Sequence, residues 1–171
     1  MKEKNVKKNP LIQDILLLLL KVGILAAVFA VLFLFVFGIA RCGDPSMSPA
    51  VKDGDLVLYY RLDKDYVQND VVVYKRNGNT EIRRIAAVAG DTVDISEEGL
   101  IINGSLQQES GIYEDTQRYE EGIEFPVTLQ EGEIFLLGDA REHSTDSRIY
   151  GPVKASDTEG TVITIVRRRG I

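Results

Sequence analysis

One long apolar run near the amino terminus constrains this chain more than any other sequence feature. From Val22 to Ala40 no residue is charged or strongly polar, and apolar residues continue back to Ile15 apart from Lys21. A helix over 22–40 would be about 28 Å long, close to the roughly 30 Å hydrocarbon thickness of a bilayer. We therefore predict a transmembrane anchor over residues 15–40, in contact with the lipid bilayer.

Two other membrane-targeting signals fit this run less well. The apolar region of a cleaved secretory signal spans only about 7–15 residues, and the end of the run, Gly38 to Arg41, is a poor cleavage site. A lipoprotein signal ending at Cys42 would need a small residue where Arg41 stands. We therefore interpret the segment as an uncleaved anchor.

The charges of the chain are divided unequally on the two sides of residue 41. Residues 1–41 hold six of the 20 Lys and Arg and two of the 26 acidic residues, a net charge of +4. The remainder holds 14 basic and 24 acidic residues, a net charge of −10, which argues against a nucleic-acid binder. Because positive charge is retained on the cytoplasmic side, we expect residues 1–14 to be a cytoplasmic basic tail and 42–171 an extracytoplasmic domain of a single-pass protein of the cell membrane.

The chain has one cysteine, Cys42, and one histidine, His143. This excludes an internal disulfide framework and a multi-cysteine metal site, and it leaves a structural zinc site close to impossible. We expect no metal and no cofactor. A zinc hydrolase or a Ser-His-Asp enzyme would depend entirely on His143.

Short β-rich segments separated by turn signals dominate the chain after residue 41. We predict a mainly β domain, an antiparallel β-barrel or sandwich, in which several wholly apolar strands are buried on both faces. Residues 105–125 interrupt the pattern with six acidic residues against Arg118, and we expect an acidic surface insertion there. The predicted strands are 56–61, 71–75, 82–89, 92–95, 100–102, 134–137 and 161–166.

Three short segments contain residues that could perform chemistry. The first, Ser46-Met47-Ser48-Pro49, lies about six residues after the predicted membrane exit. Its serines could attack a peptide bond near the bilayer, although serines beside prolines more often only occupy turns. The second segment is residues 83–91, and the third is residues 138–148, where charged and hydroxyl side chains crowd together. Ion pairs between the acids and arginines of the third segment would also orient such a site.

Together these segments resemble the type I signal peptidase family in the short form of Gram-positive bacteria. The resemblance covers essentially the whole chain: the anchor, the SMxP box at Ser46, the Asn-Asp-Val-Val-Val strand at 69–73, the basic pair followed by Gly90-Asp91, and the GDxRxxSxDSR box at 138–148. The last box is matched at every fixed position and is highly specific.

The resemblance implies a membrane-anchored serine endopeptidase that removes signal peptides from exported preproteins and uses a Ser/Lys dyad. In such a dyad an amine buried in apolar surroundings is neutral and takes the proton of the serine. Ser46 aligns with the nucleophile, Ser144 with the hydroxyl that orients the amine, and Asp146 and Arg148 with residues that hold the site together. The N–H of Ser46 would donate to the oxyanion, and residues 44 and 47 fall in the region that binds substrate.

This sequence departs from the family at the general-base position, where the lysine is replaced by Arg83. Arginine stays protonated in proteins and cannot accept the serine proton at neutral pH. A second departure is Asp44, where relatives carry serine or glycine near the oxyanion. We predict that Asp44 and Arg83 form an ion pair, so that the two departures compensate each other.

Two other residues are candidates for the base, and neither replaces the lysine well. His143 has a suitable intrinsic pKa but occupies a variable position of its box. Lys75 is expected to be an exposed lysine at the end of a strand. Two functions therefore stay open: a signal peptidase I, or a catalytically silent homologue that binds peptides in pilus or cell-wall assembly, with a pilin as a partner. A self-cleaving repressor domain with the same Ser/Lys chemistry is disfavoured by the anchor.

Overall fold

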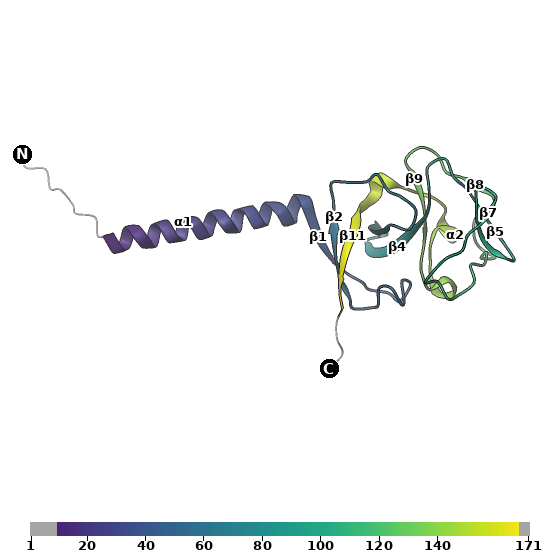
Figure 1. The fold of residues 1–171 in the computed structure, drawn as a ribbon, viewed down its shortest axis with the longest axis horizontal. Coiled ribbons are helices and arrows are strands. Elements are labelled where there is room, and N and C mark those ends of the chain that lie inside the picture. Colours follow the sequence, from purple (N-terminus) through teal and green to yellow (C-terminus); the bar gives the residue numbers. More distant parts are fainter. Residues whose placement is uncertain (1–9, 168–171) are drawn as a thin grey trace, which may run out of the picture. The chain divides into compact units, whose positions relative to one another are not determined.

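The structure, a computed structural model, describes residues 10–167. It separates into an amino-terminal helical unit that ends at Val36 and a β-rich unit that starts at Phe37 (Figure 1). Most of the predicted basic tail, including its four lysines, falls on residues 1–9 and so lies outside the described residues.

The apolar run folds as one helix. Helix α1 (Pro10–Val31) begins at a proline, which is well tolerated in a first helical turn, and continues as the π-helical segment η1 (Leu32–Val36). Together they span 27 residues, enough by length and composition to cross a membrane. None of the described side chains of these two segments is buried.

The helix ends earlier than the predicted anchor. The predicted anchor extends to residue 40, but strand β1 (Phe37–Arg41) starts immediately after Val36. β1 pairs antiparallel with β2 (Leu56–Tyr60), with Phe37 opposite Tyr60 and Arg41 opposite Leu56. This pairing satisfies the backbone hydrogen bonds of residues 37–41 in a sheet, so these residues leave the helix.

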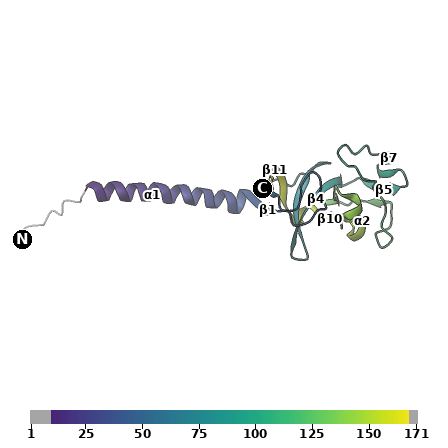
Figure 2. The same cartoon turned by 90° about the horizontal axis from the view of Figure 1, so that it is seen from below.

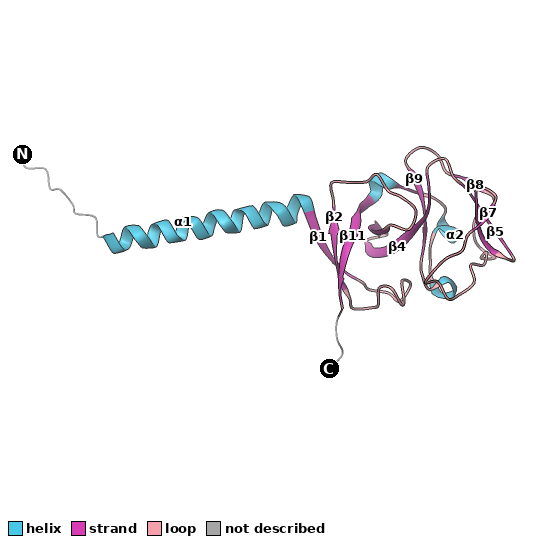
Figure 3. Ribbon diagram, in the orientation of Figure 1, coloured by secondary structure: helices cyan, strands magenta, loops and turns pink. Residues whose placement is uncertain are grey.

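The larger sheet has seven strands in the order β1-β2-β11-β3-β4-β9-β10. Every neighbouring pair in it is antiparallel. Beyond β1 and β2, its strands are β3 (Val71–Arg76), β4 (Asn79–Val88), β9 (Glu133–Leu137), β10 (Val153–Lys154) and β11 (Thr158–Val166). Figure 3 shows strands joined by long loops in this unit, with helical turns confined to short connections.

The smaller sheet has four strands in the order β7-β6-β5-β8. They are β5 (Thr92–Ser96), β6 (Gly99–Ile102), β7 (Ser105–Leu106) and β8 (Val127–Thr128). Figures 1 and 2 agree that β5 and β7 lie at one end of the β-rich unit, far from β1 and β11. The prediction of a mainly antiparallel β domain is confirmed as two open, sandwich-like sheets, and the described strands do not close into a barrel.

The buried core explains why wholly apolar strands occur in this sequence. Val72 and Tyr74 of β3 pack into one hydrophobic cluster, and Val73 between them packs into another. Successive side chains of a strand point to opposite faces, so β3 has a buried cluster on each face, as the sequence predicted. A third cluster brings Phe135 and Leu137 of β9 against Val93 and Ile95 of β5 and thereby joins the two sheets.

Candidate active site

Ser46 lies in the loop between β1 and β2, held against a segment almost a hundred residues away in sequence. The Ala140 N–H donates to the Ser46 carbonyl oxygen at 2.9 Å. A Cβ atom at Gly138 would overlap the Ser144 hydroxyl and lie 2.6 Å from the same Ser46 carbonyl, so only glycine fits there. The first and third predicted segments therefore meet at Gly138, with Ser46 and Ser144 on either side.

The carboxylate of Asp44 joins Ser46 to Arg83. Its Oδ1 accepts the backbone N–H of Ser46 at 2.8 Å, and its Oδ2 lies 3.4 Å from Arg83 Nη1. Burial opposes ionisation of Asp44, but its hydrogen bonding with Ser46 and the charge of Arg83 outweigh burial and lower the pKa of Asp44 below its ordinary value. The ion pair predicted between Asp44 and Arg83 is confirmed.

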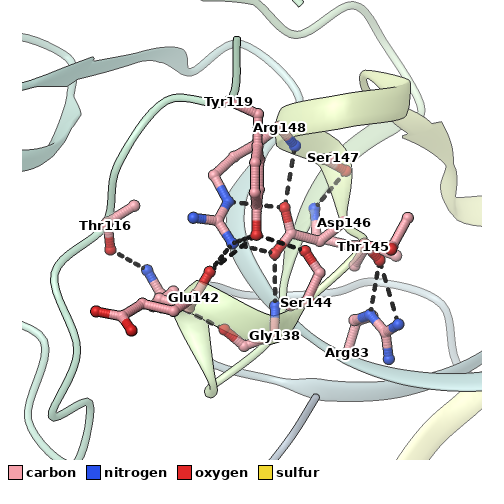
Figure 4. Close-up of polar contacts among 12 residues, drawn as sticks. Arg83, Thr116, Tyr119, Gly138, Glu142, Ser144, Thr145, Asp146, Ser147 and Arg148 are labelled. Carbon is pink, nitrogen blue, oxygen red and sulfur yellow. Dashed lines mark hydrogen bonds and ion pairs between the residues drawn. The ribbon is translucent and has the colours of Figure 1, made fainter. Parts of the chain in front are cut away.

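Arg83 is held on strand β4 by partners on several sides. It is only 2% exposed. Its Nε and Nη2 donate to the Thr145 carbonyl at 3.3 and 3.2 Å, and Nη1 donates to the Ile82 carbonyl at 2.7 Å. Nη2 also lies 3.2 Å from Glu81 Oε2. Figure 4 shows the guanidinium lying against the Thr145 backbone, so the cation has a defined position in the site.

Sequence reasoning missed Glu81, which is 7% exposed. A signal was present: Glu81 precedes Arg83 by two residues on one strand, and such residues lie on the same face. The opposite carboxylate oxygen, Oε1, accepts from Arg76 Nε at 3.1 Å. Glu81 therefore lies between two guanidinium groups.

The hydroxyl of Ser144 is buried and has no hydrogen-bond partner among the described residues. The Ser144 backbone is well fixed, because its carbonyl accepts from the Tyr119 hydroxyl at 2.9 Å. The role of orienting an amine, which the sequence resemblance predicts for Ser144, stays a prediction.

Asp146 and Arg148 form a buried pair that shapes the third segment (Figure 4). Asp146 is fully buried and Arg148 is 1% exposed. Arg148 donates to Asp146 through Nε at 2.9 Å and Nη2 at 2.8 Å. The Asp146 carboxylate also accepts the Gly138 N–H and the Arg148 N–H, which lies in the first turn of helix α2 (Ser147–Tyr150). The pair therefore ties both ends of the segment together.

The acidic insertion packs on the site through three residues that the sequence did not single out. Glu109 accepts two hydrogen bonds from Arg141, at 2.6 and 2.8 Å, and Thr116 accepts a third at 2.6 Å. Tyr119 donates to the carbonyls of Arg141 and Ser144. The acid-rich composition of 105–125 predicted solvation, and it carries no signal for these long-range contacts.

The remaining candidates lie elsewhere. His143, in the 3-10 turn η2 (Arg141–His143), is exposed. The side chain of Lys75 is 60% exposed and pairs with Glu159 at 3.2 Å. Met47, expected among the substrate-binding residues, is instead fully buried in a hydrophobic cluster with Val51, because the tight turn at 45–51 directs its side chain into the core.

A cavity of about 760 Å³ opens beside the serine loop. Its lining includes Pro49 and Ala50 of that loop, Ile85 and Ala86 of β4, and residues 107–113 of the insertion. Among residues 10–167, no group of three or more His, Cys, Asp or Glu is arranged to hold a metal ion. The cavity therefore adjoins the loop that carries Ser46, through Pro49 and Ala50.

Comparison with known proteins gives a consistent result. Residues 15–167 match the sequence model of a family described as signal peptidase, peptidase S26. Signal peptidase I of Bacillus licheniformis is 29% identical over 154 residues, which cover 83% of this chain and 80% of that protein. Signal peptidase I of Bacillus caldolyticus is 30% identical over 149 residues, covering 79% and 82%. A crystal structure of a signal peptidase I from Enterococcus faecalis is similar with a TM-score of 0.48 and 29% identity, over 58% of this chain and 97% of that one.

Proposed function

The chain belongs to the peptidase S26 family of signal peptidases, and from this premise we propose that it is a membrane-anchored signal peptidase I whose nucleophile is Ser46. Its substrates are the amino-terminal signal peptides of exported preproteins. The apolar helix over Pro10–Val36 and the signal peptidase relatives indicate a membrane location. We further place residues 1–14 in the cytoplasm and 42–171 outside it, on the charge asymmetry of the sequence.

The observation that carries this proposal is the meeting of Ser46 with the third segment. The Ala140–Ser46 hydrogen bond and the close approach at Gly138 bring the serine loop next to Ser144, and Pro49 and Ala50 of the same loop line the cavity. In the proposed reaction the Ser46 Oγ forms a bond to the scissile carbonyl carbon, the C–N bond breaks, and the serine proton ends on the leaving amine. Water then hydrolyses the acyl-enzyme. The Ser46 N–H supplies one donor to the oxyanion.

Arg83 limits the rate of this reaction. A guanidinium cannot accept the Ser46 proton at neutral pH, and a positioned general base contributes typically about 10²–10⁴-fold to such a step. We therefore expect turnover lower by about that factor than in a relative that carries the lysine. Asp146 and Arg148 keep the loop geometry, and Ser144 keeps its hydroxyl without an amine to orient.

A second candidate function is favoured by the contacts of Arg83. A side chain with four partners, two of them carboxylates, is a stable structural cation. In this alternative the chain is a catalytically silent homologue that holds a signal peptide or a pilin segment in the cavity during pilus or cell-wall assembly.

One experiment separates the two functions. The full chain, purified in detergent micelles, is incubated with a synthetic preprotein carrying small residues before the cut, and both product formation and substrate binding are measured. Slow cleavage that disappears in Ser46→Ala supports the peptidase. Saturable binding without cleavage supports the silent homologue, and neither binding nor cleavage rejects both.

A further inference from the structure

We propose that Asp44 and Glu81 make the position of Arg83 a site for a permanent cation, one that would keep a lysine protonated as well. The inference rests on the proposed function, in which residue 83 stands at the general-base position opposite Ser46. It assigns Asp44 and Glu81 as positioning residues that act through residue 83.

The argument begins with the charges around the Arg83 side chain, which is 3% exposed. Asp44 Oδ2 lies 3.4 Å from Nη1, and Glu81 Oε2 lies 3.2 Å from Nη2. The two carboxylates come from different elements, the β1–β2 loop and strand β4. A buried charge is tolerated when it is paired and hydrogen-bonded. Arg83 Nη1 both pairs with and donates to Asp44, whereas the contact of Nη2 with Glu81 is an ion pair, and Nη2 donates to the Thr145 carbonyl.

The other ionisable groups that face Arg83 do not change the pairing of its guanidinium with the two carboxylates. Arg76 of β3 pairs with Glu81 at 3.1 Å and shares its charge. Burial raises the pKa of the phenols of Tyr74 on β3 and Tyr150 on α2, and burial also raises the pKa of the Cys42 thiol, so all three are neutral at pH 7. Among the described residues, the ion pairs that link Asp44, Arg83, Glu81 and Arg76 therefore contain two carboxylates and two guanidiniums.

This arrangement is the reverse of what a lysine base needs. A lysine loses its proton readily where burial in apolar surroundings disfavours the charged amine. A carboxylate within about 4–6 Å stabilises the charged amine and raises its pKa. With carboxylates on two sides, a lysine at position 83 would stay protonated at pH 7. Arg83→Lys alone would therefore not restore a working dyad.

The first test compares cleavage by full-length Arg83→Lys, Arg83→Lys/Glu81→Gln and Arg83→Lys/Asp44→Ser/Glu81→Gln between pH 6 and pH 10. We expect the triple variant to cleave at pH 7 at least about tenfold faster than Arg83→Lys, which corresponds to one unit of amine pKa. Its rate profile should also rise at lower pH. Equal rates and identical pH profiles in Arg83→Lys and the triple variant would overturn the proposal.

The pH profile separates a change in the pKa of the lysine amine from other effects of the substitutions on the cleavage rate. Removing Asp44 also frees the Ser46 N–H, which would raise the rate without moving the profile along the pH axis. The double variant, which retains Asp44, isolates the effect of Glu81 on the profile. Arg83→Lys/Glu159→Gln is the matched control, because Glu159 is an ion-paired glutamate on β11 that binds Arg61 and Lys75. It should leave the profile of Arg83→Lys unchanged.

A second test decides the proposal if none of these variants cleaves, an outcome that would reject the proposed function. Thermal unfolding is compared for full-length Arg83→Met and for Arg83→Met/Asp44→Ser/Glu81→Gln. Removing the cation leaves Asp44 without its pairing arginine and Glu81 with Arg76 alone, so the triple variant should have a Tm higher by at least about 3 °C, the shift that about 1 kcal/mol produces in a domain of this size. A triple variant no more stable than Arg83→Met would reject the cation site.

Discussion

The backbone N–H of Ser46 donates to Asp44 Oδ1 across 2.8 Å. In the proposed reaction this N–H is a donor to the oxyanion, so a carboxylate of the protein occupies the place of the developing negative charge. The same carboxylate faces Arg83 through its second oxygen. A bound substrate must therefore displace a side chain that is also the counter-ion of the buried arginine.

Replacing Asp44 by asparagine tests the charge of this contact. Asp44→Asn keeps an oxygen for the Ser46 N–H but removes the negative charge near Arg83, and we expect a loss of about 1 kcal/mol of unfolding free energy at pH 7. The pKa of Asp44 is lowered by its hydrogen bonding with Ser46 and by Arg83, against the opposing effect of burial. The contribution of ionised Asp44 to the free energy of unfolding is therefore complete above the unfolded pKa near 3.8. It is lost as the pH falls through the lower folded pKa. Urea unfolding from pH 7 to pH 3 checks this, and a difference that stays constant over that range would contradict it.

Breaking the Asp146–Arg148 pair should be far more costly than breaking an exposed pair. Arg148→Met leaves the fully buried Asp146 without its partner, and we expect a loss of about 3–5 kcal/mol. The control is Arg118→Met, since the Arg118 side chain is 50% exposed and pairs with Asp94. Its loss should be about 1 kcal/mol or less. Equal losses in denaturant unfolding of the two variants would show that Arg148 does not hold the segment.

The contact between Glu109 and Arg141 should control how firmly the insertion packs. Glu109→Gln removes the charge that faces Arg141 at 2.6 Å, so local opening of residues 107–125 should become easier. We expect limited proteolysis of this segment to be about fivefold faster, which corresponds to about 1 kcal/mol in the opening free energy. Glu97→Gln, at an exposed position, is the matched control. Unchanged proteolysis in Glu109→Gln would mean that other contacts hold the insertion.

The proposed topology can be tested on intact cells. Protease added outside should digest the β-rich unit and leave a fragment that contains the apolar helix and residues 1–14, because the basic residues retain the amino terminus in the cytoplasm. Immunoblotting with one tag at each end of the chain measures both products. Full protection of the carboxyl-terminal tag in intact cells, with its digestion after lysis, would reverse the orientation.

Local patterns in the sequence were sufficient for seven of the strands that the structure describes, whereas β1 and the two-residue strands β7, β8 and β10 were not predicted. Alternation and apolar runs depend only on neighbouring residues, so the strand containing Val72 and the strand containing Phe135 were predicted within a few residues of their observed bounds. The end of the anchor helix was not, because the pairing of Phe37 with Tyr60 is a non-local interaction that competes with the helix.

At the candidate site, too, some features followed from the sequence and others required the tertiary structure. The sequence alone determined the family resemblance, the prediction that Arg83 replaces a lysine and the expectation that Asp44 pairs with it, since each depends on residue identity at a known spacing. Tertiary structure alone decided that Met47 is buried, that the Ser144 hydroxyl has no described partner, and that Glu109, Thr116 and Tyr119 hold the third segment. These contacts join residues 22–32 positions apart, and such contacts form only when the whole domain has closed around them. Composition describes how polar a segment is, whereas packing determines which of its side chains becomes buried against the site.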